Sequence, residues 1–301
     1  MTNRHKKSGD LLRCNHIALR AGKLTIAMVT KRRDFVEVKN MFKFLCQSDV
    51  EQTKGCVFKR GFTPKQQQIA DREHELLHIA KQLVEQDGFN NFTMDKLTAA
   101  SPYSKGTIYN HFSSKEDVIT ALCTSALRHE MSFLKRALAF EGTTRERVLA
   151  LHVAYVTSAK VEPVLLNCLM TAKTPWVMQK ASKERLQVQE ELEQQCTQLI
   201  DAAMNVAVQS GDLKLSSNSG LDCVSFANWA VTFGSIALLS SANSCHSIAR
   251  VKDHNVFLFS INCVLDGLNW QPLSHAWDYQ RTWQRIEQEI FSAELDALDK
   301  L

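Results

Sequence analysis

The chain has 301 residues, 45% of them apolar and 23% charged, with only 5 prolines and 11 glycines. This composition is typical of a globular protein with ample apolar material for a buried core, and the scarcity of turn-forming residues favours long helices. Nine cysteines are scattered along the chain without a C-x-x-C pair, which argues against a disulfide framework or a zinc module.

The net charge of +4 is unevenly distributed along the sequence. Residues 1–65 contain 15 Lys and Arg against 5 Asp and Glu, a local charge of +10, whereas the remaining residues carry −6. A basic segment ahead of an acidic body is consistent with polyanion binding and equally with an unstructured leader. Because the apolar residues of 1–62 follow no sustained period, we expect a basic, disordered N-terminal extension there.

Regular structure is predicted to begin at Thr63. This residue is a suitable N-cap, Pro64 occupies the first helical position and Gln66 the third, which is the pattern of a capping box. Apolar residues at helical spacing then predict a helix over 64–87, and Gly88 is suited to end it.

Two short helices are predicted next. Thr93 can cap a helix over 94–100, and Pro102 interrupts that helix because proline disfavours a helical residue before it. Ser104 can then cap a second short helix over 105–110.

The rest of the chain shows one helical pattern after another. Ser113 and Glu116 form a capping-box pattern for a helix that continues to about residue 139. Further helices are predicted over 144–159, 163–171, 175–209, 219–245, 253–269 and 274–298. Since no segment shows the strict alternation of a strand, the predicted fold class is all-α.

Residues 93–112 have the layout of a helix-turn-helix, with two short helices joined by a tight turn and preceded by a longer helix. The outer face of the second short helix is small and polar. Such a face can enter a DNA major groove, where Lys and Asn bond to base edges. The candidate DNA-contacting residues are Thr93, Ser104, Lys105, Gly106, Thr107, Tyr109, Asn110, His111 and Lys115. The alternative is an ordinary solvated helix, with Tyr109 in the core and His111 as a surface histidine.

The run from Ser104 to Phe112, S-K-G-T-I-Y-N-H-F, resembles the TetR (TetR/AcrR) family of transcriptional regulators, and the resemblance covers about residues 66–120. Residues 92–97 and 114–117 also keep the family spacing. One departure lies in the turn, where Ser101-Pro102-Tyr103 replaces the usual Ala-Gly-Val. Proline cannot adopt the positive φ that glycine permits, so the turn must differ locally. The arm of about 60 residues is also longer than the family usually carries.

The resemblance implies an N-terminal three-helix DNA-binding domain over 63–116, followed by a helical ligand-binding and dimerisation domain over 117–301. It implies a homodimeric, ligand-responsive repressor that binds a palindromic operator and dimerises through 219–245 and 253–269. The implied interface residues are Trp229, Phe233, Phe257, Ile261 and Leu265. The implied effector-pocket residues are His152, Tyr155, Asn167, Met170, Trp176 and Phe226. For each of these residues the alternative is plain core packing.

Residues 223–245 carry no charge and are long enough to cross a bilayer, so a membrane-associated helical protein anchored there is the alternative function. Their many hydroxyl and amide side chains instead favour burial between protein surfaces. No phosphate-binding loop, nucleophile elbow or H-E-x-x-H pattern occurs, so we expect no enzyme activity, cofactor or metal site. The expected partners are double-stranded DNA, a second copy of the chain and an unidentified small-molecule effector, in the cytoplasm and without a membrane.

Overall fold

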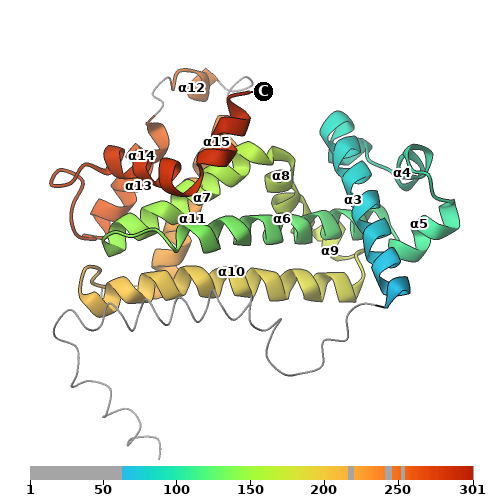
Figure 1. Ribbon diagram of the computed structural model, residues 1–301, viewed down its shortest axis with the longest axis horizontal. Coiled ribbons are helices and arrows are strands. Elements are labelled where there is room, and N and C mark those ends of the chain that lie inside the picture. The colour runs from blue at the N-terminus through green and yellow to red at the C-terminus, as the bar shows by residue number, and fades with distance from the viewer. Residues whose placement is uncertain (1–62, 216–219, 241–245, 252–254, 301) are drawn as a thin grey trace, which may run out of the picture. The chain divides into compact units, whose positions relative to one another are not determined.

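The computed structural model describes residues 63–215, 220–240, 246–251 and 255–300, and the predicted N-terminal extension at 1–62 lies outside these residues. Within the described ranges the chain forms helices and connecting segments, without a strand (Figure 1). The all-α prediction is therefore confirmed.

The first three helices are those predicted from the capping residues. They are α3 (Pro64–Asn91), α4 (Met94–Ala100) and α5 (Lys105–His111). Thr63 and Gln66 form the capping box, and the hydroxyls of Thr93 and Ser104 accept hydrogen bonds from the first turns of α4 and α5. Gly88 interrupts the helix where predicted, with a non-helical φ of 77° and ψ of 164°, and three further helical residues follow before α3 ends at Asn91.

The start of α6 (Lys115–Ala137) differs from the prediction. The capping residue is Ser114, whose hydroxyl accepts from the backbone N–H of Asp117 at 3.1 Å, and not Ser113 with Glu116. Ser113 instead donates from its backbone N–H and its hydroxyl to the Asp117 carboxylate, at 2.9 and 2.5 Å. Consecutive serines offer the same cap chemistry, so sequence spacing alone could not choose between them.

The remaining helices follow the predicted order with two breaks. They are α7 (Thr144–Val161), α8 (Pro163–Ala172), α9 (Pro175–Met178), α10 (Lys183–Ser210), α11 (Leu221–Ser240), α12 (His246–Ala249), α13 (Val256–Gly267), α14 (Tyr279–Ile290) and α15 (Ser292–Leu298). The segment predicted as one helix over 175–209 is interrupted between α9 and α10. The segment predicted over 274–298 begins only at Tyr279 and breaks at Phe291, whose ψ is 16°.

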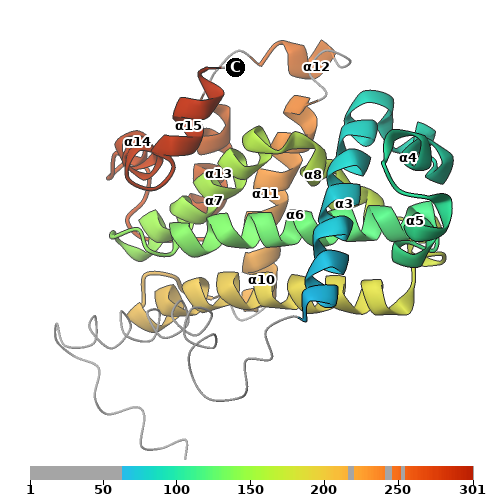
Figure 2. The same ribbon diagram turned by 45° about the vertical axis from the view of Figure 1, so that its right-hand side comes forward.

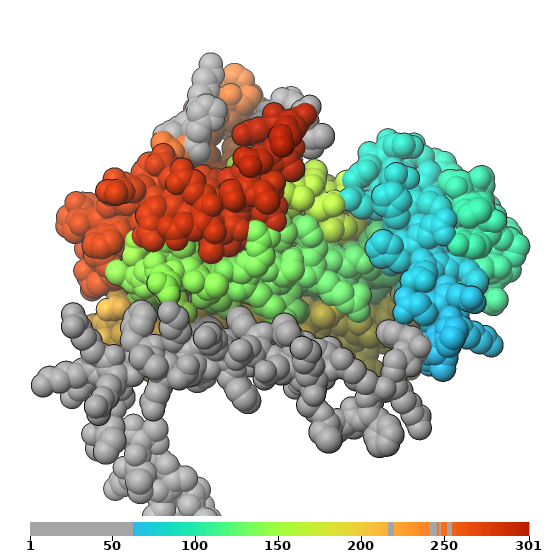
Figure 3. Space-filling view, viewed as in Figure 1, coloured from blue at the N-terminus to red at the C-terminus, as the bar shows by residue number. Residues whose placement is uncertain are grey.

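Two long helices, α6 and α10, pack along each other, and several of the other helices pack around them (Figure 2). At one end, α3 packs on α6 and α8, with α4 and α5 beside it. Helix α7 packs on α6 and α10, and the chain bends by 101° between α7 and α8. Helices α14 and α15, red in Figure 3, cover α7 on the face shown there.

A buried arginine fastens the C-terminal helices to α7. The Arg145 guanidinium donates to the carbonyl of Trp270 at 2.7 Å and to Oδ1 of Asn262 at 3.0 Å. It also lies 2.6 Å from Asp266 and over the ring of Tyr279. Because its side chain is fully buried, these partners replace water around both terminal nitrogens of the guanidinium, while its Nε has no partner among the described residues.

Arg145→Ala is expected to lower the free energy of unfolding by about 3 kcal/mol, because it removes one partner of a buried ion pair. Urea denaturation followed by far-ultraviolet circular dichroism measures the change. Arg281→Ala is the matched control, since the Arg281 residue is exposed and its loss should cost less than about 0.5 kcal/mol. Equal stability of the two variants would contradict the anchoring role of Arg145.

Candidate nucleic-acid interface and ligand cavity

The two short helices rest on a continuous apolar core. Leu97 of α4, Ile108 of α5 and Phe112 after it are fully buried, and they belong to one cluster with Leu76 of α3 and Phe92. Ala100, the last residue of α4, is exposed. The packing fixes the backbone of α5 while leaving its opposite face in solvent.

The turn between α4 and α5 closes without a left-handed residue, as the proline required. Ser101 is extended, with φ −100° and ψ 154°, and its hydroxyl accepts from the backbone N–H of Tyr103 at 3.3 Å. The Tyr103 hydroxyl donates to Glu75 of α3 at 2.5 Å, and Arg72 lies over its ring. Side-chain contacts to α3 therefore hold a turn that in the family pattern contains glycine.

The exposed face of α5 contains several of the predicted DNA-contacting residues. Ser104, Lys105 and Asn110 are exposed, and Tyr109 is 41% exposed although it is a large aromatic residue. The Lys105 ammonium lies 3.0 Å from Asp95 and 5.7 Å from the centre of the Tyr109 ring. Both groups of the Lys105–Asp95 pair are exposed, so the pair is weak and leaves Lys105 available to another anion.

Nothing in the described part of the chain packs closely against Gly106. A Cβ built on it would meet nothing within 4 Å, and its φ lies outside the left-handed range. Close helix-to-helix packing, which is one reason for a glycine within a helix, is thus absent here among the described residues. The other explanation, close approach of an external molecule to the α5 backbone, stays a prediction.

His111 lies away from the exposed face. Its side chain is only 6% exposed, with Nδ1 at 3.5 Å from Glu73 of α3. Its carbonyl accepts from Arg185 of α10 at 2.7 Å, while the same guanidinium donates to Glu73 at 3.1 Å and lies over the Phe112 ring. We therefore exclude the His111 side chain from the interface. Arg185, which no sequence pattern singled out, connects α10 to the end of α5.

Three other predicted residues lie at the edge of this face. Thr93 is exposed, and its hydroxyl caps α4. Thr107 is half-buried, with its hydroxyl 3.0 Å from that of Ser104. Lys115, the first residue of α6, is half-buried with its ammonium 5.3 Å from the ring centre of Trp176. The ring faces the cation without neutralising its charge.

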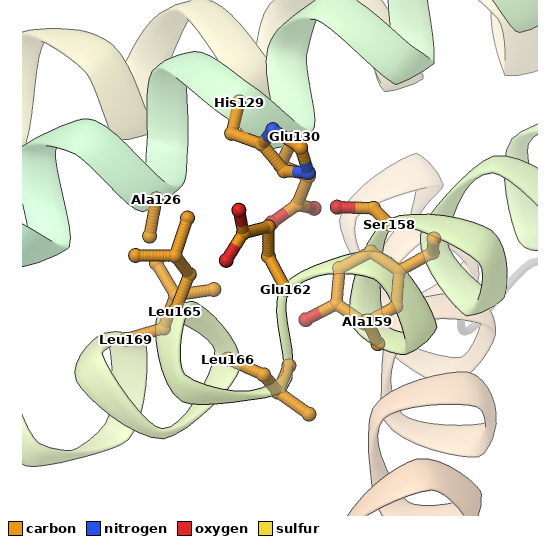
Figure 4. A pocket seen from close by; sticks show the side chains of 10 residues that line it. Ala126, His129, Glu130, Ser158, Ala159, Glu162, Leu165, Leu166 and Leu169 are labelled. Carbon is orange, nitrogen blue, oxygen red and sulfur yellow. The ribbon is translucent and has the colours of Figure 1, made fainter. Parts of the chain in front are cut away.

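Two adjacent cavities lie among the helices of the regulatory part. One, with about 250 Å³ of empty volume that includes open solvent, lies between α6, α7 and α8 (Figure 4). The other, with about 410 Å³ that include open solvent, lies between α6, α7, α10 and α11. Glu130 and Tyr155 line both cavities. Of the predicted pocket residues, His152 and Tyr155 therefore line a cavity.

The remaining predicted pocket residues lie elsewhere. Asn167, Met170, Trp176 and Phe226 are exposed and line neither cavity. The 3.6-residue repeat does not reveal which side of α8 or α11 faces inward when both sides are apolar, so these choices were not determined by the pattern.

The second cavity contains a buried polar network. The His152 ring nitrogens lie 2.5 Å from the Thr232 hydroxyl and 2.9 Å from Oδ1 of Asn228, both on α11. Burial lowers the pKa of His152 to about 4, more than the hydrogen bond to Asn228 raises it, so the imidazole is neutral near pH 7. The network ties α7 to α11.

Glu130 has no such partners in the described part of the chain. Figure 4 shows its carboxylate turned toward the first cavity, where Ser158 and Glu162 also point. Glu162 is paired with Lys81, whereas no hydrogen bond or ion pair reaches Glu130. Withdrawal from water raises the pKa of Glu130 to about 8.

The predicted dimer residues divide into two groups. Ile261 and Leu265 are each 1% exposed within one chain, so they are core residues rather than interface residues. Trp229 is 42% exposed, while Phe233 and Phe257 are half-buried. Two residues outside that set are more exposed, namely Phe226 at 65% and Phe259 at 69%.

By length and hydropathy, α11 could cross a membrane, and it is the one single helix of the described residues that passes this test. Asn228 and Thr232 lie within α11 and are buried in hydrogen bonds to His152. This arrangement is that of a helix packed within a bundle, and it does not favour the membrane anchor. Among the described residues no group of three or more His, Cys, Asp or Glu side chains is placed to hold a metal ion.

An all-helical chain with a helix-turn-helix on a buried three-helix core belongs to the class of DNA-binding regulators. Residues 76–122 match the family model described as bacterial regulatory proteins, tetR family. The match runs from the middle of α3 into α6 and includes the exposed face of α5. Residues 76–122 are thus similar to the bacterial regulatory proteins of the tetR family, as the sequence predicted.

Solved structures share the fold. A transcriptional regulator of the TetR/AcrR family from Thermobifida fusca aligns with a TM-score of 0.50 at 19% identity, covering 65% of this chain and 98% of that one. A protein of unknown function from Rhodococcus sp. RHA1 aligns with a TM-score of 0.53 at 20% identity, covering 65% of this chain and 95% of that one. No curated protein matches the sequence.

The variant Gly106→Ala distinguishes a role of Gly106 in folding stability from a role in contact with DNA. Because the added methyl group meets open space and alanine is the better helix former, the variant should gain roughly 0.5 kcal/mol in unfolding free energy. Its affinity for DNA should nevertheless fall, since the methyl group would stand between the helix and a docked duplex. Thermal unfolding and an electrophoretic shift measure the two effects. A variant with unchanged DNA affinity would remove Gly106 from the interface.

Proposed function

We propose that the chain acts as a homodimeric, ligand-responsive repressor that binds a palindromic operator, in the cytoplasm and without enzymatic activity. The observation that carries this proposal is the pairing of a fixed backbone with an exposed polar face on α5. Ile108 is fully buried, whereas Lys105 and Asn110 of the same helix are exposed. A short helix anchored on one side and polar on the other suits insertion into a major groove.

The roles of individual residues follow from their chemistry. Lys105 and Asn110 can bond to base edges, and Lys105 would exchange its weak pair with Asp95 for a contact with DNA. Tyr109 and Lys115 suit phosphate contacts, which position the protein without reading the sequence. Ser104 and Thr107 allow close approach because their side chains are short.

A second copy of the chain is the proposed occupant of the apolar surface on α11 and α13. These two helices pack against each other, and Phe226, Trp229 and Phe259 remain exposed on them. The rings of Phe226 and Trp229 are 6.2 Å apart, so they form a continuous aromatic surface on α11. Exposed aromatic clusters of this kind typically mark protein interfaces. A twofold dimer would present two copies of α5 to two half-sites, hence the palindrome.

Effector binding would act on α5 through the contacts at the ends of α6 and α10. Arg185 joins α10 to the carbonyl of His111 at the end of α5, and the backbone N–H of Ser182 donates to Asp117 of α6 at 2.7 Å. A ligand between α6, α7 and α10 would favour one arrangement of these helices and so shift the population of DNA-competent dimers.

Lys105→Ala and Asn110→Ala should each weaken binding to the DNA immediately upstream of the protein's own gene by about 1–3 kcal/mol. An electrophoretic shift at two salt concentrations measures the loss, and wild-type binding should weaken steeply as salt rises. Lys214→Ala is the control, because it removes the same charge from an exposed residue beyond the far end of α10. Wild-type footprints from both α5 variants would refute the residue assignment.

Phe259→Glu should weaken self-association at least about tenfold, because a carboxylate would replace an aromatic side chain at the proposed dimer surface. Analytical ultracentrifugation over a concentration series gives the dissociation constant. Met178→Glu introduces the same charge at another exposed apolar residue, on α9, and should leave the dimer intact. A monomeric wild-type protein, or equal dissociation of both variants, would argue against an α11–α13 interface.

A further inference from the structure

Glu130 occupies an unusual position in the regulatory part of the chain. It lies on α6 at the point where the two cavities meet, since it lines both of them. A carboxylate withdrawn from water is costly unless it is paired or hydrogen-bonded. Glu130 is half-buried at the cavities, and in the described residues it has neither kind of partner. Partial burial is the cause of its raised pKa.

In the smaller cavity the buried Nε2 of His129 also lacks a partner, but burial lowers the pKa of this imidazole, which is therefore neutral near pH 7. In the larger cavity several polar groups already have partners. His152, Asn228 and Thr232 bond to one another, and the hydroxyl of Ser225 donates to Asp201 at 2.6 Å. They therefore gain little from a ligand. Glu130 differs from them because a partner supplied from outside would satisfy a group that the protein leaves alone.

The charge of the cavity walls favours one sign of ligand. The residues that line the two cavities, all within the described part of the chain, include no lysine and no arginine. Lys81 lies nearby, but its ammonium is paired with Glu162. An anionic ligand would find no counter-charge, whereas a cation would find Glu130 together with the rings of Tyr155 and Trp229.

We propose that the cavities shared by Glu130 and Tyr155 bind an organic monocation with an apolar body, and that Glu130 is the counter-ion of its cationic group. The apolar body would lie against Leu134, Leu151 and Met204 in the larger cavity. The role of this cation as the effector rests on the proposed function. Binding of the cation itself requires neither DNA nor a partner chain.

Three probes with the same alkyl chain test the charge preference: decyltrimethylammonium, decanoate and 1-decanol. Isothermal titration calorimetry on the full chain without DNA, at pH 9, where the Glu130 carboxyl is ionised, and below micellar concentrations, gives their dissociation constants. The wild type should bind the ammonium at least about tenfold more tightly than the alcohol or the carboxylate, because only the ammonium pairs with Glu130. Equal or tighter binding of decanoate, or no binding of any probe, overturns the inference without recourse to a variant.

Glu130→Gln should abolish this preference while it keeps the wild-type affinity for 1-decanol, which reports that the cavity is intact. Glu190→Gln, which removes the same charge from an exposed position on α10, should keep the preference. A Glu130→Gln protein that still prefers the ammonium overturns the role of Glu130. A separate electrophoretic shift assay with decyltrimethylammonium tests the proposed function, and absence of DNA binding counts against that function. The calorimetry alone decides whether the cation site exists.

Discussion

The connection between the helix-turn-helix and the regulatory helices depends on the hydrogen bonds of the Asp117 carboxylate. This carboxylate accepts from the backbone N–H and hydroxyl of Ser113 and from the backbone N–H of Ser182, which brings together the end of the helix-turn-helix and the approach to α10. Burial alone would raise the pKa of Asp117, but the hydrogen bonds outweigh it and lower the pKa. Fixed N–H and O–H donors thus take the place of water around the ionised Asp117 carboxylate.

From this junction α6 runs to the cavities, so a single helix carries both the contact to the DNA-binding part and Glu130. Arg185 makes a second connection by joining α10 to the end of α5. Two long helices that pack along each other and are each fastened to the helix-turn-helix can transmit a small shift at the cavity. The side chains between them have few alternative arrangements because protein interiors are close-packed.

The sequence was most informative where local chemistry decides structure. Thr63, Thr93 and Ser104 cap the helices predicted for them, since an N-cap needs only a side-chain oxygen and the next three residues. The exposed positions of Lys105 and Asn110 followed from the same local pattern. The prediction was wrong at Ser113, because the neighbouring serine offered equal chemistry and Asp117 decided between them.

Residues whose roles depend on distant partners could not be assigned from the sequence. Ile261 and Leu265 were predicted at a dimer surface but are buried, and apolar residues alone cannot distinguish a core from an interface. Arg185 and Glu130 belong to no motif. Arg185 is important because a carbonyl and a carboxylate lie beside it in space. Glu130 is important because none of the described residues pairs with it.

The pair Asn228 and Thr232 has a consequence for the whole of α11. A helix that is apolar on nearly all sides could pack at many rotations about its own axis with similar burial. Two polar side chains one turn apart, both reaching His152, allow only one azimuth. That rotational setting then determines which aromatic side chains of α11 are left facing outward, so a buried histidine specifies the aromatic surface that we propose for dimerisation.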